Sequence, residues 1–463
     1  MSENDLAQIA YLLRRAGFGA RRDELEAYAA KSYDAVVDEL LHPERFPEVE
    51  DDVFDRYYGQ ELVGEYTALW FYRMINTSRP LVEKMALFWH HLLATGSGKI
   101  GHYTSSTGQI ELFRRVGMTD LRTVLTEVSK DPAMIYWLDN NENLKGEPNE
   151  NYGRELLELF SMGAGNYTED DIKNASRAFT GWTFTQPIPI YPQGWYPSAF
   201  VYREDAHDDS SKTFLGETGH FNGEDIVDIV VRQPATARFI SRHLYNFFVA
   251  DEPQVPAWPL VPPKDPEAVD ALVEAYMDSD GDVRTILEVL FKSDFFKEAR
   301  FSKMKSPTEL VTGVLKLAGT YRSPELGMTK YAGAVGLMGQ QLLDPPTVEG
   351  WHTGDEWIDS GTLKERVNFA VGEVGDPTKP GIRSIVDRLS AEASASGGLS
   401  PERFLDLCLE LVGPMSVSDK TRNTLLKYAE SGGDLGFEEE DESESRVVRM
   451  VQFIVATIEY QYA

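Results

Sequence analysis

The stretch PNENYGRELLELFSMGAGNYTEDDIKNASRAFTGW, residues 148–182, combines helix signals with a dense set of polar side chains. Apolar or small residues recur in it every three or four positions, which predicts one helix from position 149 or 150 to about Met162. These residues are Tyr152, Leu156, Leu159, Phe160 and Gly163. Because successive helical residues turn by about 100°, Asn151, Glu155 and Glu158 form a polar line beside this stripe, with Arg154 next to it.

A turn of sequence Gly-Ala-Gly-Asn, residues 163–166, follows the first helix. Thr168 and Asp171 then have the spacing of an N-cap residue and its N3 partner, so a second helix is expected to run towards Phe179. The sequence therefore predicts that two helices joined by a glycine turn carry the candidate site.

Helical periodicity continues through most of the remaining chain. It predicts a mainly α protein, a single large orthogonal bundle with long irregular excursions and one small β-hairpin. The longest excursion follows Trp182, where proline, glycine and aromatic residues replace the helical pattern. Six prolines mark residues 251–266 as a connection between an N-terminal helical region that carries the central block (1–250) and a C-terminal helical region packed on it (267–463). The acidic run 438–444 is expected to be an exposed loop between the last two helices.

Composition limits the possible classes of protein. The chain has 463 residues, 42% of them hydrophobic, which suffices for one large core or about two to three ordinary ones. Its 75 acidic and 45 basic residues give a net charge of −30, which argues against binding to nucleic acid or to anionic membrane surfaces. Cys408 is the only cysteine, which excludes intramolecular disulfides and cysteine-clustered metal sites, and its apolar surroundings predict core packing.

Several familiar signals are missing from the sequence. The amino terminus lacks the basic-then-apolar order of a secretory signal, and no apolar run is long enough to span a bilayer, so the chain as written is expected to be cytoplasmic. Residues Gly96–Lys99 match only the end of a phosphate-binding loop, and the sequence contains no GxSxG, GxGxxG or CxxC motif. Nucleotide binding, serine hydrolysis and thiol chemistry are therefore not expected.

Several blocks, in order along the chain, resemble a large bacterial family catalogued as domain of unknown function eighteen-hundred. The blocks are LLRRAGFG (12–19), MALFWHHLLAT (85–95), residues 131–182, residues 207–249, KSPTELV (305–311) and PPTVEGWHTGDEWI (345–358). The pattern NENxxRELxELF…GNYTE…TGW is highly specific, and the resemblance extends to the carboxyl-terminal residues 459–462.

The resemblance implies a largely helical fold. It also implies a partner similar to alkaline phosphatases and sulfatases, because many members are encoded beside such a protein, and members often carry export signals. Where the family commonly has FWHNHF, residues 88–93 read FWHHLL, so Leu92 stands at the second histidine position and His91 at the asparagine position. A role that requires the spaced histidine pair would have to use His91 from a different helix face.

Carboxylates and one histidine form the candidate reactive set. Glu155 and Glu158 lie on adjacent turns, so they suit a hard metal ion or a general acid–base pair; the alternative is a solvated face with Arg154 as ionic partner. His90 lies on an apolar helix and needs a partner, which can be a metal, a carboxylate or an ordinary core hydrogen bond. With both glutamates, His90 would supply the ligands that helical bundles use for transition metals, and Asp208 is a further candidate ligand.

The irregular excursion and the aromatic residues supply the remaining candidates. His207 and Lys212 lie on the excursion and would act as a base and as an anion contact, unless local hydrogen bonds merely hold this loop. Candidate substrate contacts are Asn149, Asn151, Trp182, Trp351 and Trp357. The asparagines also suit helix caps, and the tryptophans suit either a sugar-binding platform or the ends of helices.

Three functions remain open from the sequence. The first is a hydrolytic or oxidative enzyme that depends on a divalent or transition metal ion of unspecified identity, with Arg154 and Lys212 orienting a polar substrate. The second is a non-catalytic helical scaffold for the phosphatase-like partner, in which the polar block fixes helix packing. The third is a carbohydrate-binding protein. The sequence does not specify an oligomeric state.

Overall fold

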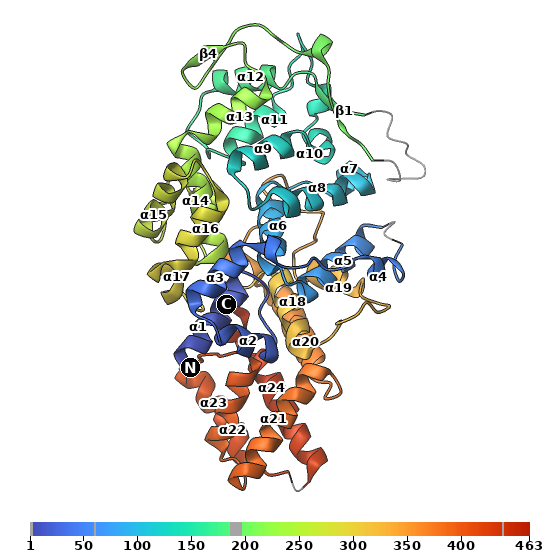
Figure 1. The fold of residues 1–463 in the computed structure, drawn as a ribbon, viewed down its shortest axis with the longest axis vertical. Helices are drawn as coiled ribbons and strands as arrows, with labels where there is room; N and C mark the ends of the chain where they lie inside the picture. The colour runs from blue at the N-terminus through green and yellow to red at the C-terminus, as the bar shows by residue number, and fades with distance from the viewer. Residues whose placement is uncertain (1–2, 60–61, 186–196, 438) are drawn as a thin grey trace.

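Helices account for most of the chain in the computed structural model, which describes residues 3–59, 62–185, 197–437 and 439–463. These residues form 24 α-helices and four short strands, which confirms the prediction of a mainly α protein. The molecule is elongated, and its helices lie in an upper, a middle and a lower tier (Figure 1).

The central polar block and the segments around it form the upper tier (Figure 1). Its helices are α9 (Leu121–Ser129), α10 (Pro132–Trp137), α11 (Asn151–Glu158), α12 (Glu169–Ala178) and α13 (Gly223–Val231). The excursion holds two antiparallel pairs, β1 (Trp182–Phe184) with β2 (Phe200–Tyr202) and β3 (Lys212–Phe214) with β4 (Glu217–Gly219). The predicted hairpin is therefore present as β3–β4, while residues 186–196 of the excursion lie outside the described residues.

Helix α11 ends earlier than its apolar pattern predicts. Beyond Glu158 the backbone widens, since the N–H of Phe160 donates to the carbonyl of Glu155 at 3.0 Å, a step of five residues. Gly163 then adopts a φ of 75°, which favours glycine. Helix α12 opens with the predicted capping box between Thr168 and Asp171, because that signal lies within four residues.

A column of helices links the upper tier to the middle one. It comprises α14 (Pro234–Phe248), α15 (Pro266–Asp278), α16 (Val283–Lys292) and α17 (Asp294–Glu298). The proline-rich connection packs against α14, where the buried Arg242 and Glu252 pair at 2.6 Å. Its Gln254 also donates a 2.8 Å hydrogen bond to the carbonyl of Thr353, so this connection is fixed at both sides.

The middle tier brings the two halves of the sequence together. From the first half come α1 (Glu3–Arg15), α2 (Arg22–Ala29), α3 (Tyr33–Leu41), α4 (Asp52–Asp55), α5 (Val63–Asn76), α6 (Pro80–Leu92), α7 (Ser97–Ile100) and α8 (Tyr103–Val116). From the second half come α18 (Pro307–Ala318), α19 (Lys330–Leu337) and α20 (Ser360–Val374). As its nearly all-round apolar sequence predicts, α6 is buried along most of its length.

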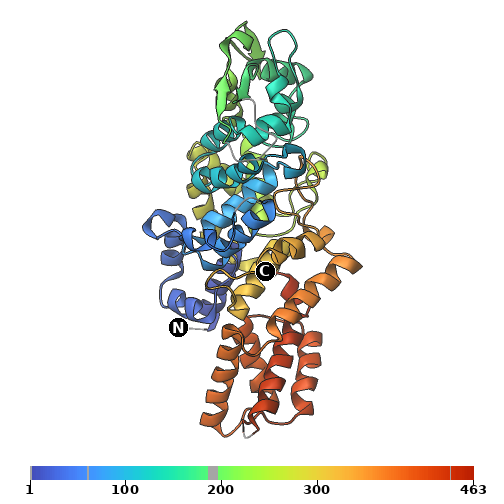
Figure 2. The same ribbon diagram turned by 90° about the vertical axis from the view of Figure 1, so that its right-hand side faces the viewer.

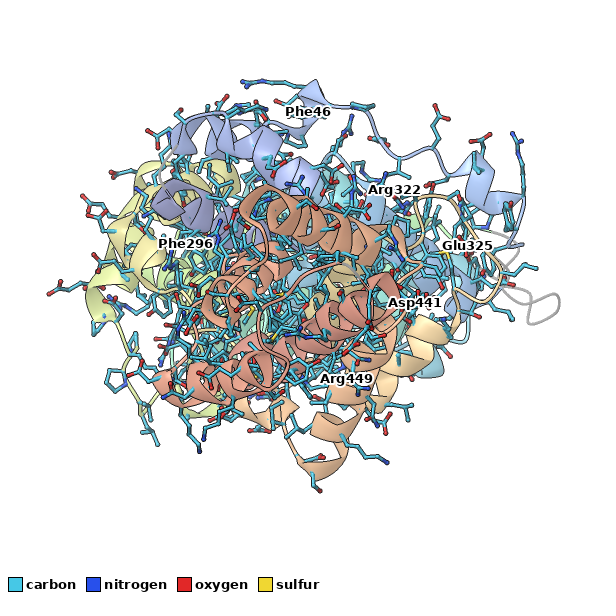
Figure 3. All side chains as sticks on the ribbon, turned by 90° about the horizontal axis from the view of Figure 1, so that it is seen from below. Phe46, Phe296, Arg322, Glu325, Asp441 and Arg449 are labelled. Atoms are coloured by element: carbon cyan, nitrogen blue, oxygen red, sulfur yellow. The ribbon has the colours of Figure 1, made fainter. Side chains whose placement is uncertain are left out.

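Four helices form the lower tier, which Figure 2 shows as a bundle set off from the rest. They are α21 (Pro380–Ser396), α22 (Pro401–Val412), α23 (Asp419–Ser431) and α24 (Glu440–Val455). The expectation of an exposed acidic loop over 438–444 is wrong, because α24 begins within this run. Acidic residues such as Asp441 near a helix start interact favourably with the helix dipole. Figure 3 views this end of the molecule, with Asp441 and Arg449 on α24.

The end of the chain returns to the middle tier. Tyr462 forms an isolated antiparallel bridge with Met304, and the N–H of Phe301 donates to the carbonyl of Ala463 at 2.8 Å. Buried apolar residues from all three tiers, including Cys408, belong to one connected cluster. None of the helices in the described parts of the chain combines the length and apolar character needed to cross a bilayer.

Candidate functional site

The start of α11 is fixed by the two predicted asparagines. Oδ1 of Asn149 accepts the backbone N–H of Asn151 at 2.9 Å, as an N-terminal cap does. The backbone N–H of Asn149 donates to Oδ1 of the buried Asn143 at 3.0 Å, and the amide of Asn151 lies 3.4 Å from a carboxylate oxygen of Asp139. Both asparagines therefore anchor the helix to the loop that precedes it.

Arg154 connects α11 to α12 at the surface. Its Nη1 and Nη2 donate to the two carboxylate oxygens of Glu169 at 3.1 and 3.0 Å. Nη2 also donates to Glu150 at 3.1 Å, one helical turn away. Arg154 thus has two carboxylate partners within the protein.

Glu155 and Glu158 point from the same side of α11, as their spacing predicts. Glu155 is half-buried, and its pKa is raised by burial and by the charge of Glu158, with Arg154 opposing the shift. Oε2 of Glu158 accepts a 2.9 Å hydrogen bond from the hydroxyl of Tyr167, which follows the glycine turn. This turn therefore holds the Glu158 carboxylate, while burial favours the protonated form of Glu155.

The candidate residues on the excursion, His207, Asp208 and Lys212, form hydrogen bonds that hold the excursion next to the end of α12. Nδ1 of the buried His207 lies 2.9 Å from the carbonyl oxygen of Thr180. Although burial opposes the shift, hydrogen bonds from Arg177 and Ser210 lower the pKa of Asp208. Lys212 is buried and donates to the carbonyl oxygens of Asp208 and Ser210. His207 and Asp208 therefore have partners at Thr180 and in α12, and Lys212 has partners within the loop.

His90 is enclosed in the middle tier. Its Nε2 accepts the backbone N–H of Leu343 at 3.0 Å, and its ring packs edge-on against Trp70 and Trp351. Burial, and to a lesser extent the neighbouring His91, lowers the pKa of His90 to about 3, so the ring is neutral near neutral pH. The histidine thus has a core partner, a backbone N–H that neither periodicity nor composition identifies.

The predicted tryptophans lie in the interior. Trp351 and Trp357 are only 4% and 5% exposed. Trp182 is also buried, donates from Nε1 to Asn222 at 2.8 Å and packs edge-on against Phe179. The structure therefore does not place these three side chains on an open platform for a sugar.

The proposed metal ligands are His90, Glu155, Glu158 and Asp208. Their surroundings differ, since His90 lies among the rings of the middle tier and Asp208 pairs with Arg177 at 2.8 Å in the upper one. Within residues 3–59, 62–185, 197–437 and 439–463, no group of three or more His, Cys, Asp or Glu side chains is arranged to hold a metal ion. Dependence on a metal stays a prediction.

One predicted residue, Glu158, does line an open pocket, whose volume is about 260 Å³. Its walls are the turn after α11, one side of α14 and the proline-rich connection, with Glu349 from the stretch after α19. The lining residues include Glu158, Asn166, Phe239, Trp258 and Glu349. The pocket thus combines carboxylates and an amide with aromatic surface, as small-molecule sites do.

Neighbouring contacts fix Trp258 in the aromatic wall. The guanidinium of Arg242 lies 4.5 Å from the ring centre of Trp258. Nε and Nη2 of Arg242 both donate to the buried Glu252, at 2.9 and 2.6 Å. Nε1 of Trp258 donates to the carbonyl of Pro253 at 2.7 Å. A ring fixed in this way offers a ligand a preformed apolar face.

Comparison with known proteins identifies the family of this chain. A family model described as "Protein of unknown function (DUF1800)" matches residues 11–462. The chain belongs to the DUF1800 family. No curated protein and no solved structure shows significant similarity to it. The DUF1800 description names no activity, so a function has to be argued from the site.

The segment FWHHLL of this DUF1800 member, residues 88–93, places its two histidines in different surroundings. The ring of His91 stacks on Trp351 with an interplanar angle of 12°, while His90 meets the same indole edge-on. His91 also lines a small internal pocket of about 30 Å³ with His243 and Lys303. The two neighbouring imidazoles therefore contact Trp351 in different orientations.

Most residues of the DUF1800 pocket were not candidates from the sequence, among them Arg242, Trp258 and Glu349. Trp258 lies next to a proline, in a connection interpreted only as a boundary. Glu349 belongs to a stretch whose tryptophans received the attention, and Arg242 lies on an ordinary helix. The position of Trp258, in a segment that interrupts helices, was the one feature of the sequence that could have indicated this pocket.

Proposed function

We propose that this protein is a hydrolytic enzyme that binds a small hydroxylated molecule in the pocket beside α11, with Glu158 as its acid–base group. The observation that carries the proposal is the position of Glu158, which lies on the pocket wall and is held there by Tyr167. Glu158 also belongs to the most distinctive block of the sequence.

The walls suit a hydroxylated molecule with one apolar face. Trp258 and Phe239 offer ring surface, on which the C–H face of a sugar or polyol packs. Glu158 and Glu349 accept hydrogen bonds from hydroxyl groups. The amide of Asn166 is oriented by its donation to the carbonyls of Met162 and Gly163, which leaves its side-chain oxygen as a further acceptor.

The paired carboxyl groups of α11 supply the chemistry. A carboxylate at Glu158 accepts a proton from a water or hydroxyl group as that oxygen attacks, and returns it to the leaving oxygen. Burial and the charge of Glu158 raise the pKa of Glu155, which favours the protonated form of Glu155. Glu155 therefore acts on the substrate through Glu158, as a positioning residue.

The first test is a binding screen by thermal denaturation with monosaccharides, polyols and amino alcohols. A ligand that stabilises the wild type should bind Trp258→Ala roughly tenfold or more weakly, because the apolar face is lost. Glu169→Gln, an exposed carboxylate outside the pocket, is the control and should bind normally. Unchanged binding by Trp258→Ala would place the ligand elsewhere.

The second test is turnover of nitrophenyl glycosides and esters. Glu158→Gln should reduce kcat by roughly a hundredfold or more, the usual contribution of a general acid–base group, while the protein still binds the ligand. Glu155→Gln should shift the pH profile of the remaining activity. Assays with added Mg²⁺, Mn²⁺ or Zn²⁺ test the predicted metal dependence in the same experiment. Full activity of Glu158→Gln would contradict the proposed role.

A non-catalytic scaffold is the second candidate. It is favoured by the internal hydrogen bonds and ion pairs of Asn149, Arg154, Asp208 and Lys212, which fix the packing of the upper tier. The phosphatase- or sulfatase-like partner stays a prediction. Co-purification with that neighbouring protein, together with the absence of turnover on every substrate tested, would favour this candidate over the enzyme.

A further inference from the structure

A second cavity lies where the two ends of the sequence meet. It has a volume of about 70 Å³ and is enclosed by α1, the loop after it, residues 301–305, residues 412–415 and the last residues of the chain. It is separate from the pocket beside α11, since the two share no lining residue. Neither the family description nor the motifs discussed above assign it a role.

The charge of this cavity is opposite to that of the chain. Within the described part of the chain, its wall includes Arg14, Arg15 and Lys305, and its one Asp or Glu side chain is Glu309; the last residue, Ala463, also lines it. Glu309 already pairs with two cations, because Arg15 donates to its Oε1 at 2.9 Å and Lys84 donates to the same oxygen. Basic side chains on the described wall therefore outnumber carboxylate side chains.

Arg14 has two donor nitrogens without a partner. Its Nε and Nη2 atoms are buried and have no hydrogen-bond partner among the described residues, although its guanidinium lies 5.6 Å from the ring centre of Phe301. Burial lowers the pKa of Arg14 to about 10, and the charge of Arg300 contributes in the same direction. Buried donors of a guanidinium are normally paired, so an unpaired edge is costly unless a ligand occupies it.

Arg73 shows which group the Nε and Nη2 edge of a guanidinium binds in this protein. In Arg73, Nε donates to Oδ1 of Asp51 at 3.1 Å, and Nη2 donates to Oδ2 of the same carboxylate. The two nitrogens without partners in Arg14 are the same two atoms. A carboxylate is therefore the group that completes Arg14 in the way that Asp51 completes Arg73.

Lys305 supplies a second cation. Its Nζ donates to the carbonyl oxygen of Tyr460 at 2.6 Å and lies 4.1 Å from the ring centre of the same residue. Burial and the charges of Arg14 and Arg366 hold the pKa of Lys305 well below its usual range. An anion beside Arg14 would relieve this repulsion, since it adds the missing opposite charge.

The rest of the cavity wall indicates which kind of anion would bind there. Apolar side chains dominate it: Phe18, Leu25, Phe301, Leu317, Val412 and Met415. A hydrated inorganic oxyanion would lose its water against this surface, whereas the hydrocarbon part of an organic acid packs on it. The volume corresponds to roughly five water positions, which suits a short-chain acid.

An adjacent groove borders the cavity. It has a volume of about 220 Å³, runs between α2 and the helices α21 and α22, and shares five lining residues with the cavity wall: Ala20, Leu25, Leu317, Val412 and Gly413. Together the two hollows are lined by seven Arg or Lys side chains and three Asp or Glu side chains. Three of the groove arginines already pair with carboxylates: Arg21 with Glu24, Arg22 with Glu410 and Arg388 with Glu26.

We infer that the cavity between α1 and the returning end of the chain is a binding site for a small organic carboxylate, which pairs with Arg14 and packs its hydrocarbon part on the apolar wall. The site joins α1 to the lower tier, so its occupancy stabilises the contact between them. It does not depend on the enzyme proposed above.

The test is thermal denaturation of the full chain with sodium butyrate or benzoate, against sodium chloride at equal ionic strength. The carboxylate should raise the Tm of the wild type with a saturable dependence on its concentration. Arg14→Met should bind roughly tenfold or more weakly, and without ligand it should be at least as stable as the wild type, because an unpaired buried cation is gone. A purely structural arginine would instead lower the Tm when replaced.

Two further variants locate the effect. Arg115→Gln removes one exposed positive charge outside the cavity and should respond like the wild type. Gly313→Ala adds a methyl group to the cavity wall, where its nearest neighbour is the carbonyl oxygen of Phe18 at 3.6 Å, so it should fold normally and bind more weakly. A response retained by Arg14→Met, or no carboxylate response in the wild type, would overturn the inference. A response to phosphate or sulfate in place of the carboxylates would overturn the assigned ligand class.

Discussion

Nη1 of Arg15 donates a 2.9 Å hydrogen bond to Oε1 of Glu309 and so joins α1 to α18 across 294 positions of the sequence. Both side chains are almost fully buried, and Lys84 from α6 meets the same carboxylate. Three helices of the middle tier therefore share one negative charge.

Replacing Glu309 by glutamine should strongly destabilise the protein, because it leaves two buried cations without their counterion. The expected loss is about 3–5 kcal/mol in the free energy of unfolding, measured by urea denaturation. Glu288→Gln, which breaks an exposed pair with Lys292, should cost about 1 kcal/mol or less. Equal effects of the two variants would show that the buried cluster contributes no more than a surface pair.

His90 should make stability fall in acid. The unfolded chain takes up a proton at a pKa near 6.5, whereas the buried ring does so only near 3, so protonation between these values favours unfolding. The contribution of His90 is complete above pH 6.5 and decreases by up to about 1.4 kcal/mol per pH unit below it. His90→Gln should therefore show a shallower decline in urea denaturation between pH 6.5 and 4. His220→Gln, an exposed histidine, should keep the wild-type slope, and coinciding slopes for wild type and His90→Gln would contradict the prediction.

Asp131 should have the opposite effect to His90, because it should make the protein less stable as the pH rises. It is buried and accepts hydrogen bonds from Gln109 at 2.9 Å and from the N–H of Met134 at 3.1 Å, and burial raises its pKa to about 7. Between the unfolded pKa near 3.8 and 7, the folded state retains a proton that the unfolded chain releases. Stability from this group is therefore present at low pH and is lost as the pH rises through this window.

Asp131→Asn isolates this effect. The amide keeps an oxygen that can cap α10, but it does not ionise, so its stability relative to the wild type should improve from pH 5 to pH 8. Asp120→Asn, at the start of α9, provides a cap replacement nearer the surface. A stability difference between wild type and Asp131→Asn that does not change with pH would show that Asp131 is ionised throughout.

Gly163 should tolerate no side chain. Its φ of 75° disfavours other residues, and a Cβ atom there would lie 2.8 Å from Cδ2 of Phe239 in the pocket wall. Gly163→Ala should cost about 1–3 kcal/mol and weaken any ligand that packs on Phe239. Gly165→Ala is the matched control, since φ is also positive there but open space surrounds the added methyl group. Similar ligand binding by both variants would show that the ligand does not contact Phe239.

Local signals were predictable, and long-range partners were not. Thr168 and Asp171 lie within one helical turn, so their capping box could be recognised from spacing alone. His90 was correctly identified as a histidine that needs a partner, but that partner is the backbone N–H of Leu343, 253 positions away. Periodicity carries no information on such a contact.

The same limit applies to the candidate site. Glu158 was identified from the polar line on its helix, whereas Trp258 reaches the same pocket through the fold of a proline-rich connection. Lys212 and Asp208 were identified by residue type, and in the structure Lys212 donates to carbonyls of its own loop while Asp208 pairs with Ser210 and with Arg177 of α12. Residue chemistry indicates what a side chain can do, but tertiary contacts decide whether it remains available.

A crystal structure with the ligand that stabilises the protein most in the thermal screen tests the central claim most directly. The account predicts electron density for that ligand between Trp258 and Glu158, with a ligand oxygen within about 3.2 Å of the Glu158 carboxylate. Density at His207 and Lys212, with the pocket beside α11 empty, would contradict it.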